Sequence, residues 1–312
     1  MTPSDSRKIA VLFFGTHDFG AAILKALIES GRVLVKEVIT QPDRPVGRTQ
    51  ELQAPPVKML AQSYDIAVSQ YKSLASYTPT TQDVPLAIAT QYGALIPKHI
   101  LDAFPFGILN VHPSLLPQYR GASPIQSALL HGDTKTGVTI MKLDEGMDTG
   151  PIFAQKTLSI APDDTYATLE PKLAALGAEL LLETILAYLS GAIAPQPQDD
   201  ARATHCTKIK REDGRIDWSH SAQEIYNQFR AYTPWPGIWT TWNGTRLKLL
   251  DVHPKKKTIP PGEARIVHDT LQIGCGSGSF QVDRLQKEGK KPVSVEEFLL
   301  GNRDIDGAQL GT

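Results

Sequence analysis

The sequence of 312 residues has no uninterrupted apolar run near the ~18 residues that a membrane-spanning helix needs. Residues 1–8 show neither the apolar core of a signal peptide nor the arginine-rich pattern of a transit peptide. The two cysteines, Cys206 and Cys275, fit no metal-ligand spacing. We therefore expect a cytoplasmic protein with no membrane contact and no metal. A disulfide between the two cysteines is possible but not implied, and two reduced thiols are the expectation.

The motifs of two large enzyme classes are also missing. No serine or cysteine lies in a nucleophile motif such as G-x-S-x-G. Gly15 and Gly20 follow the first apolar run, but they do not form G-x-G-x-x-G. The next apolar run ends in Ile39-Thr40-Gln41, without an acidic residue for a ribose. These absences disfavour serine or cysteine nucleophiles and nicotinamide-dependent dehydrogenases.

Charge of either sign is not in large excess, because the formal net charge is −1. This value argues against a strongly basic nucleic-acid binder. The charge is unevenly distributed, however. Residues 204–312 hold 16 Lys and Arg against 13 Asp and Glu, whereas residues 1–203 hold 16 against 20. The slightly basic C-terminal part permits a polyanionic partner without requiring one.

The first 190 residues alternate short apolar runs with helical patterns, which is typical of βαβ units and a mostly parallel sheet. A buried strand is predicted at 8–15, followed by a helix that stops at Ser30-Gly31. A long apolar helix is predicted from Asp163 to Gly191. Further strands are predicted near 33–40, 66–70, 85–90, 107–112 and 136–143.

Residues 192–204 have the polar, proline-containing composition of a linker. Beyond it, a helix is predicted at 219–231, and short β-like runs follow near 264–268, 270–273 and 279–285. Asn243-Gly244 between two apolar runs is a strong hairpin signal. We therefore predict an α/β fold with a Rossmann-like domain at 1–191, a linker at 192–204 and a small OB-like β-barrel at 205–312.

Two polar side chains stand at the end of one predicted strand. In Ile108-Leu109-Asn110-Val111-His112-Pro113, alternation places Asn110 and His112 on one face, and the proline ends the strand. Open α/β folds bind ligands where parallel strands end. An isolated N-x-H is more often an ordinary pair of strand-end residues, so these two residues need support from elsewhere in the chain.

That support comes from a loop after the predicted strand at 136–143. It reads Asp144-Glu145-Gly146-Met147-Asp148-Thr149-Gly150, and alone it is typical of a solvated turn. Together with Asn110 and His112, one of its acids, Asp148, could orient the imidazole. Amide, imidazole and carboxylate without a nucleophile suit direct attack of an amine on an acyl carbon. Asn110 would then stabilise the oxyanion.

Longer segments make the assignment more specific. NVHPSLLPQYRGASPIQ, GVTIMKLDEGMDTG and QPDRPVGR closely resemble the methionyl-tRNA formyltransferase family of folate-dependent formyltransferases. The later segments RAYTPWPGIWTTWNG and LQKEGKKPVSVEEFLLG resemble the C-terminal domain of that family. The resemblance covers roughly residues 8–303. It implies formyl transfer from 10-formyltetrahydrofolate to the amino group of initiator methionyl-tRNA, in an enzyme that we expect to be monomeric.

The resemblance also implies roles for individual positions. It makes Asn110, His112 and Asp148 the catalytic residues. The folate-binding residues that it implies are Ser114, Leu115, Leu116 and Pro117, with Tyr92, Gly93, Leu95 and Asp144 completing the pocket.

Candidate contacts with tRNA are basic residues. Two of them, Arg44 and Arg48, lie in the long loop 41–56, whose length favours a functional role. The excess positive charge after Thr204 makes the C-terminal part the stronger candidate. Its residues are Lys208, Lys210, Arg211, Arg246, Lys248, Lys255, Lys256, Lys257, Lys290 and Lys291.

The sequence departs from the family pattern at two places. The family's G-T-P-x-F-A turn is replaced by Gly15-Thr16-His17-Asp18-Phe19-Gly20, which adds an imidazole close to the expected site. Thr49-Gln50-Glu51 stand where lysines commonly follow the position of Arg48, which weakens the case for tRNA contact there. Two alternatives stay open. One is a formyltransferase acting on a nucleotide-linked amino sugar, and the other is an inactive RNA-binding protein.

Overall fold

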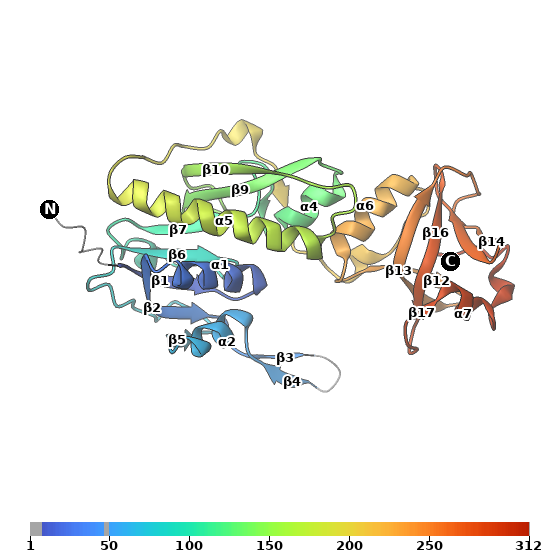
Figure 1. Ribbon diagram of the computed structural model, residues 1–312, viewed down its shortest axis with the longest axis horizontal. Coiled ribbons are helices and arrows are strands. Elements are labelled where there is room, and N and C mark those ends of the chain that lie inside the picture. Colours follow the sequence, from blue (N-terminus) through green and yellow to red (C-terminus); the bar gives the residue numbers. More distant parts are fainter. Residues whose placement is uncertain (1–7, 47–49, 312) are drawn as a thin grey trace. The chain divides into compact units, whose positions relative to one another are not determined.

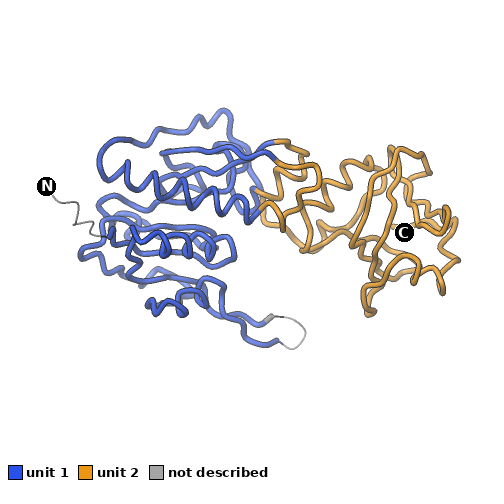
Figure 2. Tube along the Cα trace, in the orientation of Figure 1, with its two compact units in different colours: residues 1–124, 135–159, 170–206 blue, residues 125–134, 160–169, 207–312 orange. Residues whose placement is uncertain are grey.

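The computed structural model describes residues 8–46 and 50–311. The chain folds into two compact units (Figure 2). Unit 1 comprises residues 1–124, 135–159 and 170–206, and unit 2 comprises 125–134, 160–169 and 207–312. Among the described residues, no helix is both long enough and apolar enough to cross a membrane.

Unit 1 is built on a seven-stranded sheet in the order β10-β9-β7-β6-β1-β2-β5 (Figure 1). The five strands from β7 to β5 run parallel, and β9 and β10 are antiparallel to their neighbours. This arrangement confirms the predicted α/β fold with a mostly parallel sheet. The strands are β1 (Ile9–Gly15), β2 (Val33–Thr40), β5 (Ala67–Gln70), β6 (Leu86–Thr90), β7 (Ile108–His112), β9 (Lys135–Lys142) and β10 (Ile152–Ser159).

Helices cover one face of this sheet. In α5 (Tyr166–Leu189), a Cβ added to Gly177 would lie 2.9 Å from Val111 of β7 and 3.8 Å from Ile23 of α1 (Asp18–Glu29). α2 (Pro56–Ser63) packs beside α1. On the opposite face, Phe14 and Ile108 belong to a buried cluster that contains Ile100 of α3 (Lys98–Leu101). Asn110 and His112 alternate with Val111, and they therefore face away from α5.

The sequence did not predict the edge strand β10 or a small hairpin in the long loop. β3 (Arg44–Val46) pairs with β4 (Glu51–Gln53). The antiparallel direction of β9 has a direct consequence for the site. The carboxyl end of β9 lies beside the beginning of β7, because the Leu143 N–H donates to the Ile108 carbonyl. The following loop therefore turns back toward His112.

Unit 2 contains an antiparallel sheet in the order β12-β13-β16-β15-β14, with β17 paired to β16, which confirms a C-terminal antiparallel β domain. Asn243 and Gly244 both have positive φ, as a two-residue hairpin turn requires. Within residues 207–312, helices α6 (Ala222–Tyr232) and α7 (Val295–Leu299) each begin with a serine capping box. The strands are β12 (Ile238–Trp242), β13 (Thr245–Lys255), β14 (Ala264–Val267), β15 (Thr270–Gly274), β16 (Ser279–Lys287) and β17 (Val293–Ser294).

The segment expected to be a linker follows the surface of unit 1. Gln196 forms an antiparallel bridge with Ile152, and Thr204 accepts a backbone hydrogen bond from Arg120. β11 (His205–Cys206) then pairs with β8 (Arg120–Gly121). Gly121 has a φ of +123°, and a Cβ there would lie 2.1 Å from the Cys206 carbonyl oxygen. This close contact requires glycine. Both cysteines are free thiols, and burial raises the pKa of Cys275 to about 12.

Candidate functional site

β7 presents Asn110 and His112 on one face of the sheet. His112 is only 4% exposed, and its backbone pairs with Thr139 of β9. Asn110 is half-buried, and its side chain forms no hydrogen bond within residues 8–46 and 50–311. An amide with open hydrogen-bonding capacity therefore lies two residues from a buried imidazole.

The His112 ring lies between two loops. Its Nε2 is 3.0 Å from the carbonyl oxygen of Tyr119. A carbonyl can only accept, so Nε2 carries the hydrogen in this contact. The other nitrogen, Nδ1, is 3.6 Å from Oδ2 of Asp148. That distance is too long for a hydrogen bond but typical of a pair that tightens when substrate binds.

Asp148 adopts a left-handed backbone conformation, with a φ of 54°. Its Oδ2 accepts a hydrogen bond of 2.8 Å from the Gly121 N–H, and its side chain is 15% exposed. A Cβ at Gly150 would lie 1.8 Å from the Lys142 carbonyl oxygen, so the end of this loop tolerates only glycine. The loop therefore delivers one carboxylate to His112. The expected trio of Asn110, His112 and Asp148 comes together.

The residues expected to bind folate fall into two groups. Ser114 and Leu116 are buried in the loop after β7. The Ser114 hydroxyl donates to the Gln118 carbonyl at 2.6 Å, and Thr139 Oγ1 accepts from the Leu116 N–H. The Pro117 carbonyl accepts from the Thr204 N–H, and Leu115 packs against Gly137. The polar atoms named here therefore form hydrogen bonds that stabilise the loop after β7.

In the second group, Tyr92 belongs to the buried cluster on the face of the sheet opposite α5. Tyr92 is buried, Leu95 is 78% exposed, and Gly93 has a φ of +82°. Asp144 accepts hydrogen bonds from the Gly146 N–H and the Thr149 hydroxyl. It also lines an open pocket of about 620 Å³ between α3 and residues 142–146. His112 and Asp148 do not line that pocket, so the pocket by itself does not identify the catalytic site.

Two buried polar groups near this face lack hydrogen-bond partners among the described residues. They are the hydroxyl of Tyr92 and the amide nitrogen of Gln41. Burial raises the pKa of Tyr92 to about 12, and the nearby Gln41 opposes this shift without forming a well-aligned hydrogen bond. Buried groups without partners are rare in folded proteins, and a ligand that supplies the missing contacts is one explanation.

Sequence reasoning missed Arg120 and Gln198. Arg120 is buried at 4% exposure and donates to the Gln198 side chain, which in turn donates to the carbonyls of Asp148 and Gly150. The partners of Gln198 lie 48 to 78 residues away in the sequence. No local pattern could have indicated these contacts.

The basic residues expected to contact tRNA are not all equally accessible. Arg44 is exposed on β3, and Arg48 lies outside the described residues. In unit 2, the Arg246 guanidinium stacks 4.3 Å from the Trp239 ring, and burial lowers the pKa of the neighbouring Lys248. The other candidates of unit 2 are exposed. They are Lys208, Lys210, Arg211, Lys255, Lys256, Lys257, Lys290 and Lys291.

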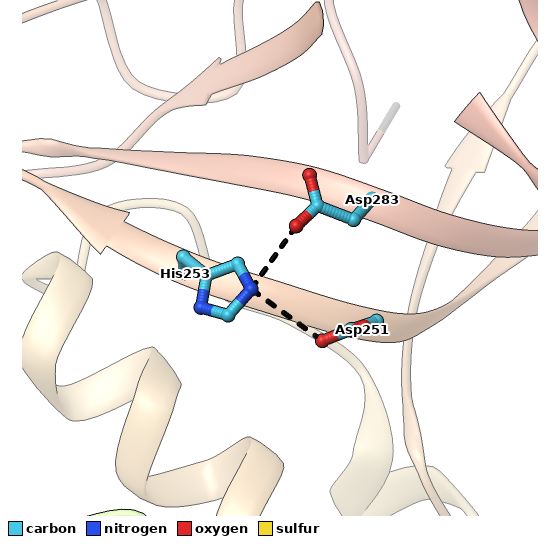
Figure 3. A group of neighbouring side chains, drawn as sticks. All are labelled: Asp251, His253 and Asp283. Carbon is cyan, nitrogen blue, oxygen red and sulfur yellow. Dashed lines mark ion pairs between the residues drawn. The ribbon is translucent and has the colours of Figure 1, made fainter. Parts of the chain in front are cut away.

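A separate cluster lies on the sheet of unit 2, where Asp251, His253 and Asp283 converge (Figure 3). His253 Nε2 is 3.0 Å from Asp283 and 3.7 Å from Asp251, and the three possible ligand atoms lie within 4.8 Å of one another. This group could hold a metal ion, although the sequence led us to expect none. Its side chains are about half exposed and already paired, so we assign it no part in the chemistry.

Comparison with known families identifies both parts of the chain. Residues 7–185 match the model of the family described as formyl transferase, and residues 208–303 match its C-terminal domain. A methionyl-tRNA formyltransferase of Geobacter metallireducens is 40% identical over 308 residues, covering 97% of this chain and 99% of that protein. A methionyl-tRNA formyltransferase of Myxococcus xanthus is 42% identical over 305 residues, covering 96% and 97%.

Solved structures share the fold at lower identity. An N-formyltransferase from Helicobacter canadensis, in complex with folinic acid and dTDP-3-aminofucose, superposes with a TM-score of 0.66. It is 18% identical, and the match covers 90% of this chain and all of that one. At this identity the likeness concerns the fold alone.

Proposed function

Because this chain belongs to the formyl transferase family, we propose that it transfers the formyl group of 10-formyltetrahydrofolate to the amino group of initiator methionyl-tRNA. The main structural support for this reaction is the position of the Asp148 carboxylate 3.6 Å from Nδ1 of His112, on the strand that also carries Asn110. The acceptor follows from relatives at 40% and 42% identity over nearly the full length of both chains.

Each catalytic side chain has a role that its position supports. Asn110 donates a hydrogen bond to the oxygen that becomes negatively charged as the amine attacks the formyl carbon. His112 keeps Nε2 on the Tyr119 carbonyl, so Nδ1 is the atom that exchanges a proton. Asp148 faces that edge of the imidazole and takes a proton from the ammonium of methionyl-tRNA, which frees the amine to attack the formyl carbon. As the bond between the formyl carbon and the folate nitrogen breaks, protonated His112 gives its Nδ1 proton to that nitrogen, and tetrahydrofolate leaves.

The residues around this trio suit a reduced folate, whose role is to supply the formyl group. Leu115, Leu116 and Pro117 provide an apolar wall, and Ser114 keeps their loop folded through its bond to Gln118. Tyr92 offers a buried hydroxyl that needs a partner. Gly93, Leu95 and Asp144 complete the candidate folate pocket on the same face.

The division of the chain follows the same proposal. Residues 1–191 form the catalytic domain, 192–204 connect it, and 205–312 form the C-terminal domain. The trio lies within a single chain, so it needs no partner subunit to complete it, and we propose a monomer. Sedimentation velocity tests this, and a stable dimer at assay concentrations would contradict it. Use of a translation substrate supports a cytoplasmic location.

The acceptor is tested by supplying 10-formyltetrahydrofolate with either charged initiator tRNA or a dTDP-linked amino sugar. We expect formylmethionyl-tRNA to form with a kcat/KM at least about 10⁴ M⁻¹ s⁻¹, within the usual range of enzymes, and no turnover of the sugar. Faster formylation of the sugar would favour the alternative acceptor. If neither acceptor were formylated, the remaining alternative would be an inactive RNA-binding protein.

We further propose that the tRNA body is bound mainly by the basic residues of the C-terminal domain, rather than by Arg44 and Arg48. Replacing Lys255, Lys256 and Lys257 together by alanine should raise KM for methionyl-tRNA while leaving KM for folate unchanged. The slope of log KM against log salt should fall by about 2 to 3, because each lost phosphate contact releases roughly one counterion fewer.

The matched control removes the same charge from unit 1, by replacing the exposed Lys36, Lys72 and Lys135 with alanine. This control should leave both KM values and the salt slope close to wild type. If Arg48→Ala abolished tRNA use while the C-terminal variant behaved as wild type, the binding surface would instead be the loop 41–56.

A further inference from the structure

Residues 196–206, here called the strap, contact two loops beside His112, one containing Tyr119 and the other containing Asp148. In Figure 1 the chain leaves α5 and returns along β10, to which Gln196 is bridged at Ile152. Thr204 accepts from the Tyr119 N–H through its hydroxyl at 2.8 Å. Gln198 contacts the other loop, at Asp148 and Gly150. The strap therefore reaches both residues that flank His112.

Both the oxygen and the nitrogen of the Gln198 side-chain amide form two hydrogen bonds each. Its oxygen accepts hydrogen bonds from Nε and Nη2 of Arg120 at 3.1 and 2.8 Å. Its nitrogen donates to the carbonyls of Asp148 and Gly150, both at 2.8 Å. The reverse orientation would place the NH₂ group against a guanidinium, so only one orientation is compatible with these partners.

Arg120 orients this amide. It is 4% exposed, and its Nη2 also pairs with Oδ1 of Asp200 at 2.6 Å. The guanidinium thus bridges two residues of the strap, and its planar fork sets the plane of the Gln198 amide. A lysine ammonium has three donors but no planar fork, so it could not bind the Gln198 oxygen through two nitrogens and fix the plane of the amide.

The two loops need such support because each carries a strained residue. Tyr119 has a φ of 60° and Asp148 a φ of 54°. Residues other than glycine persist in the left-handed region when their surroundings over-determine them. The Tyr119 carbonyl holds Nε2 of His112, and the Asp148 carboxylate faces Nδ1. The strained backbone at Tyr119 and Asp148 therefore sets the positions of the two groups that contact the His112 imidazole.

We propose that Gln198, oriented by Arg120, is a positioning residue that holds the Asp148 loop in its reactive conformation. This inference rests on the proposed catalytic role of Asp148. Gln198 does not touch the imidazole, and it acts by fixing the carbonyls on either side of Thr149. Losing this contact lets the Asp148 carboxylate move away from Nδ1, and a displacement near 1 Å lowers turnover by about 100-fold.

The test variant is Gln198→Glu in the full chain. A glutamate keeps the oxygen that Arg120 binds, but it cannot donate to the two carbonyls. We expect kcat for formyl transfer to fall about 10- to 100-fold, with KM for folate and for methionyl-tRNA changed less than about threefold. Gln198→Met, which keeps the length of the side chain, is the second variant and should show the same split between kcat and KM.

The matched control is Gln196→Ala. Gln196 is an exposed glutamine of the same strap, and among the described residues the one hydrogen bond of its side chain goes to the Ala194 carbonyl. We expect wild-type kcat and KM from this variant. A loss of kcat equal to that of Gln198→Glu would mean that any change in the strap disturbs the enzyme, which would overturn the specific role of Gln198.

A double-mutant cycle with Asp148→Asn separates positioning from a general structural effect. If Gln198 acts through Asp148, Gln198→Glu should lower the residual activity of Asp148→Asn by less than about threefold. An equal fold-loss in both backgrounds, or wild-type kcat for both Gln198 variants, would overturn the inference. Near wild-type activity of Asp148→Asn alone would instead overturn the proposed catalytic role of Asp148, whatever Gln198 does.

Discussion

The His112→Ala variant is expected to lose at least about 100-fold in kcat for formyl transfer to methionyl-tRNA, the usual contribution of a positioned acid–base group. Alanine removes the only side chain that contacts both the Tyr119 carbonyl and the Asp148 carboxylate among the described residues. Steady-state kinetics with both substrates measure the effect. KM for each substrate should change little, because the imidazole acts mainly on the transition state.

The buried position of His112 makes a second variant necessary. Its loss leaves a cavity and removes the imidazole donor at 3.0 Å from the Tyr119 carbonyl, which the Cys206 thiol also approaches at 3.4 Å, so His112→Ala should also lower the melting temperature. His112→Gln places an amide nitrogen where Nε2 lies and can keep that donor, but it has no group that exchanges protons near neutral pH. A folded His112→Gln variant with near wild-type kcat would contradict the assignment of His112.

The Asp148→Asn variant is expected to lose about 10²- to 10⁴-fold in kcat with little loss of stability. Asparagine tolerates a φ near 54°, and its oxygen can still accept the Gly121 N–H. The substitution therefore removes the negative charge while keeping the backbone. Without that charge, the side chain can neither accept a proton from the attacking ammonium nor stabilise a protonated His112. Single-turnover formylation measures the loss.

Asp65→Asn provides the matched control. Asp65 is an exposed aspartate of unit 1 that also has a left-handed backbone, with a φ of 55°. The same substitution there should leave kcat, both KM values and the melting temperature close to wild type. If Asp148→Asn also kept wild-type turnover, the carboxylate would be a structural acceptor for Gly121 rather than a catalytic group.

The sequence by itself determined the elements whose signals are local. Alternating apolar runs predicted the strands of the parallel sheet, and β2 coincides with the predicted range 33–40. Asn243-Gly244 predicted the hairpin between β12 and β13, because both residues adopt positive φ at low cost. The same kind of local pattern, N-x-H followed by proline, singled out Asn110 and His112 as candidates. The resemblance to a known family supplied their roles.

Only the tertiary structure decided how the candidate site is held. A chain pattern carries no information on strand direction at the sheet edge, so the antiparallel β9 and the return of its loop were not predictable. Residues 192–204 have the composition of a linker because they combine two prolines with several polar side chains. That polarity instead serves the hydrogen bonds of Gln198 and Thr204 to loops that are distant in sequence. Such contacts depend on long-range folding, which places Arg120, Gln198 and Asp148 together, and no local preference encodes them.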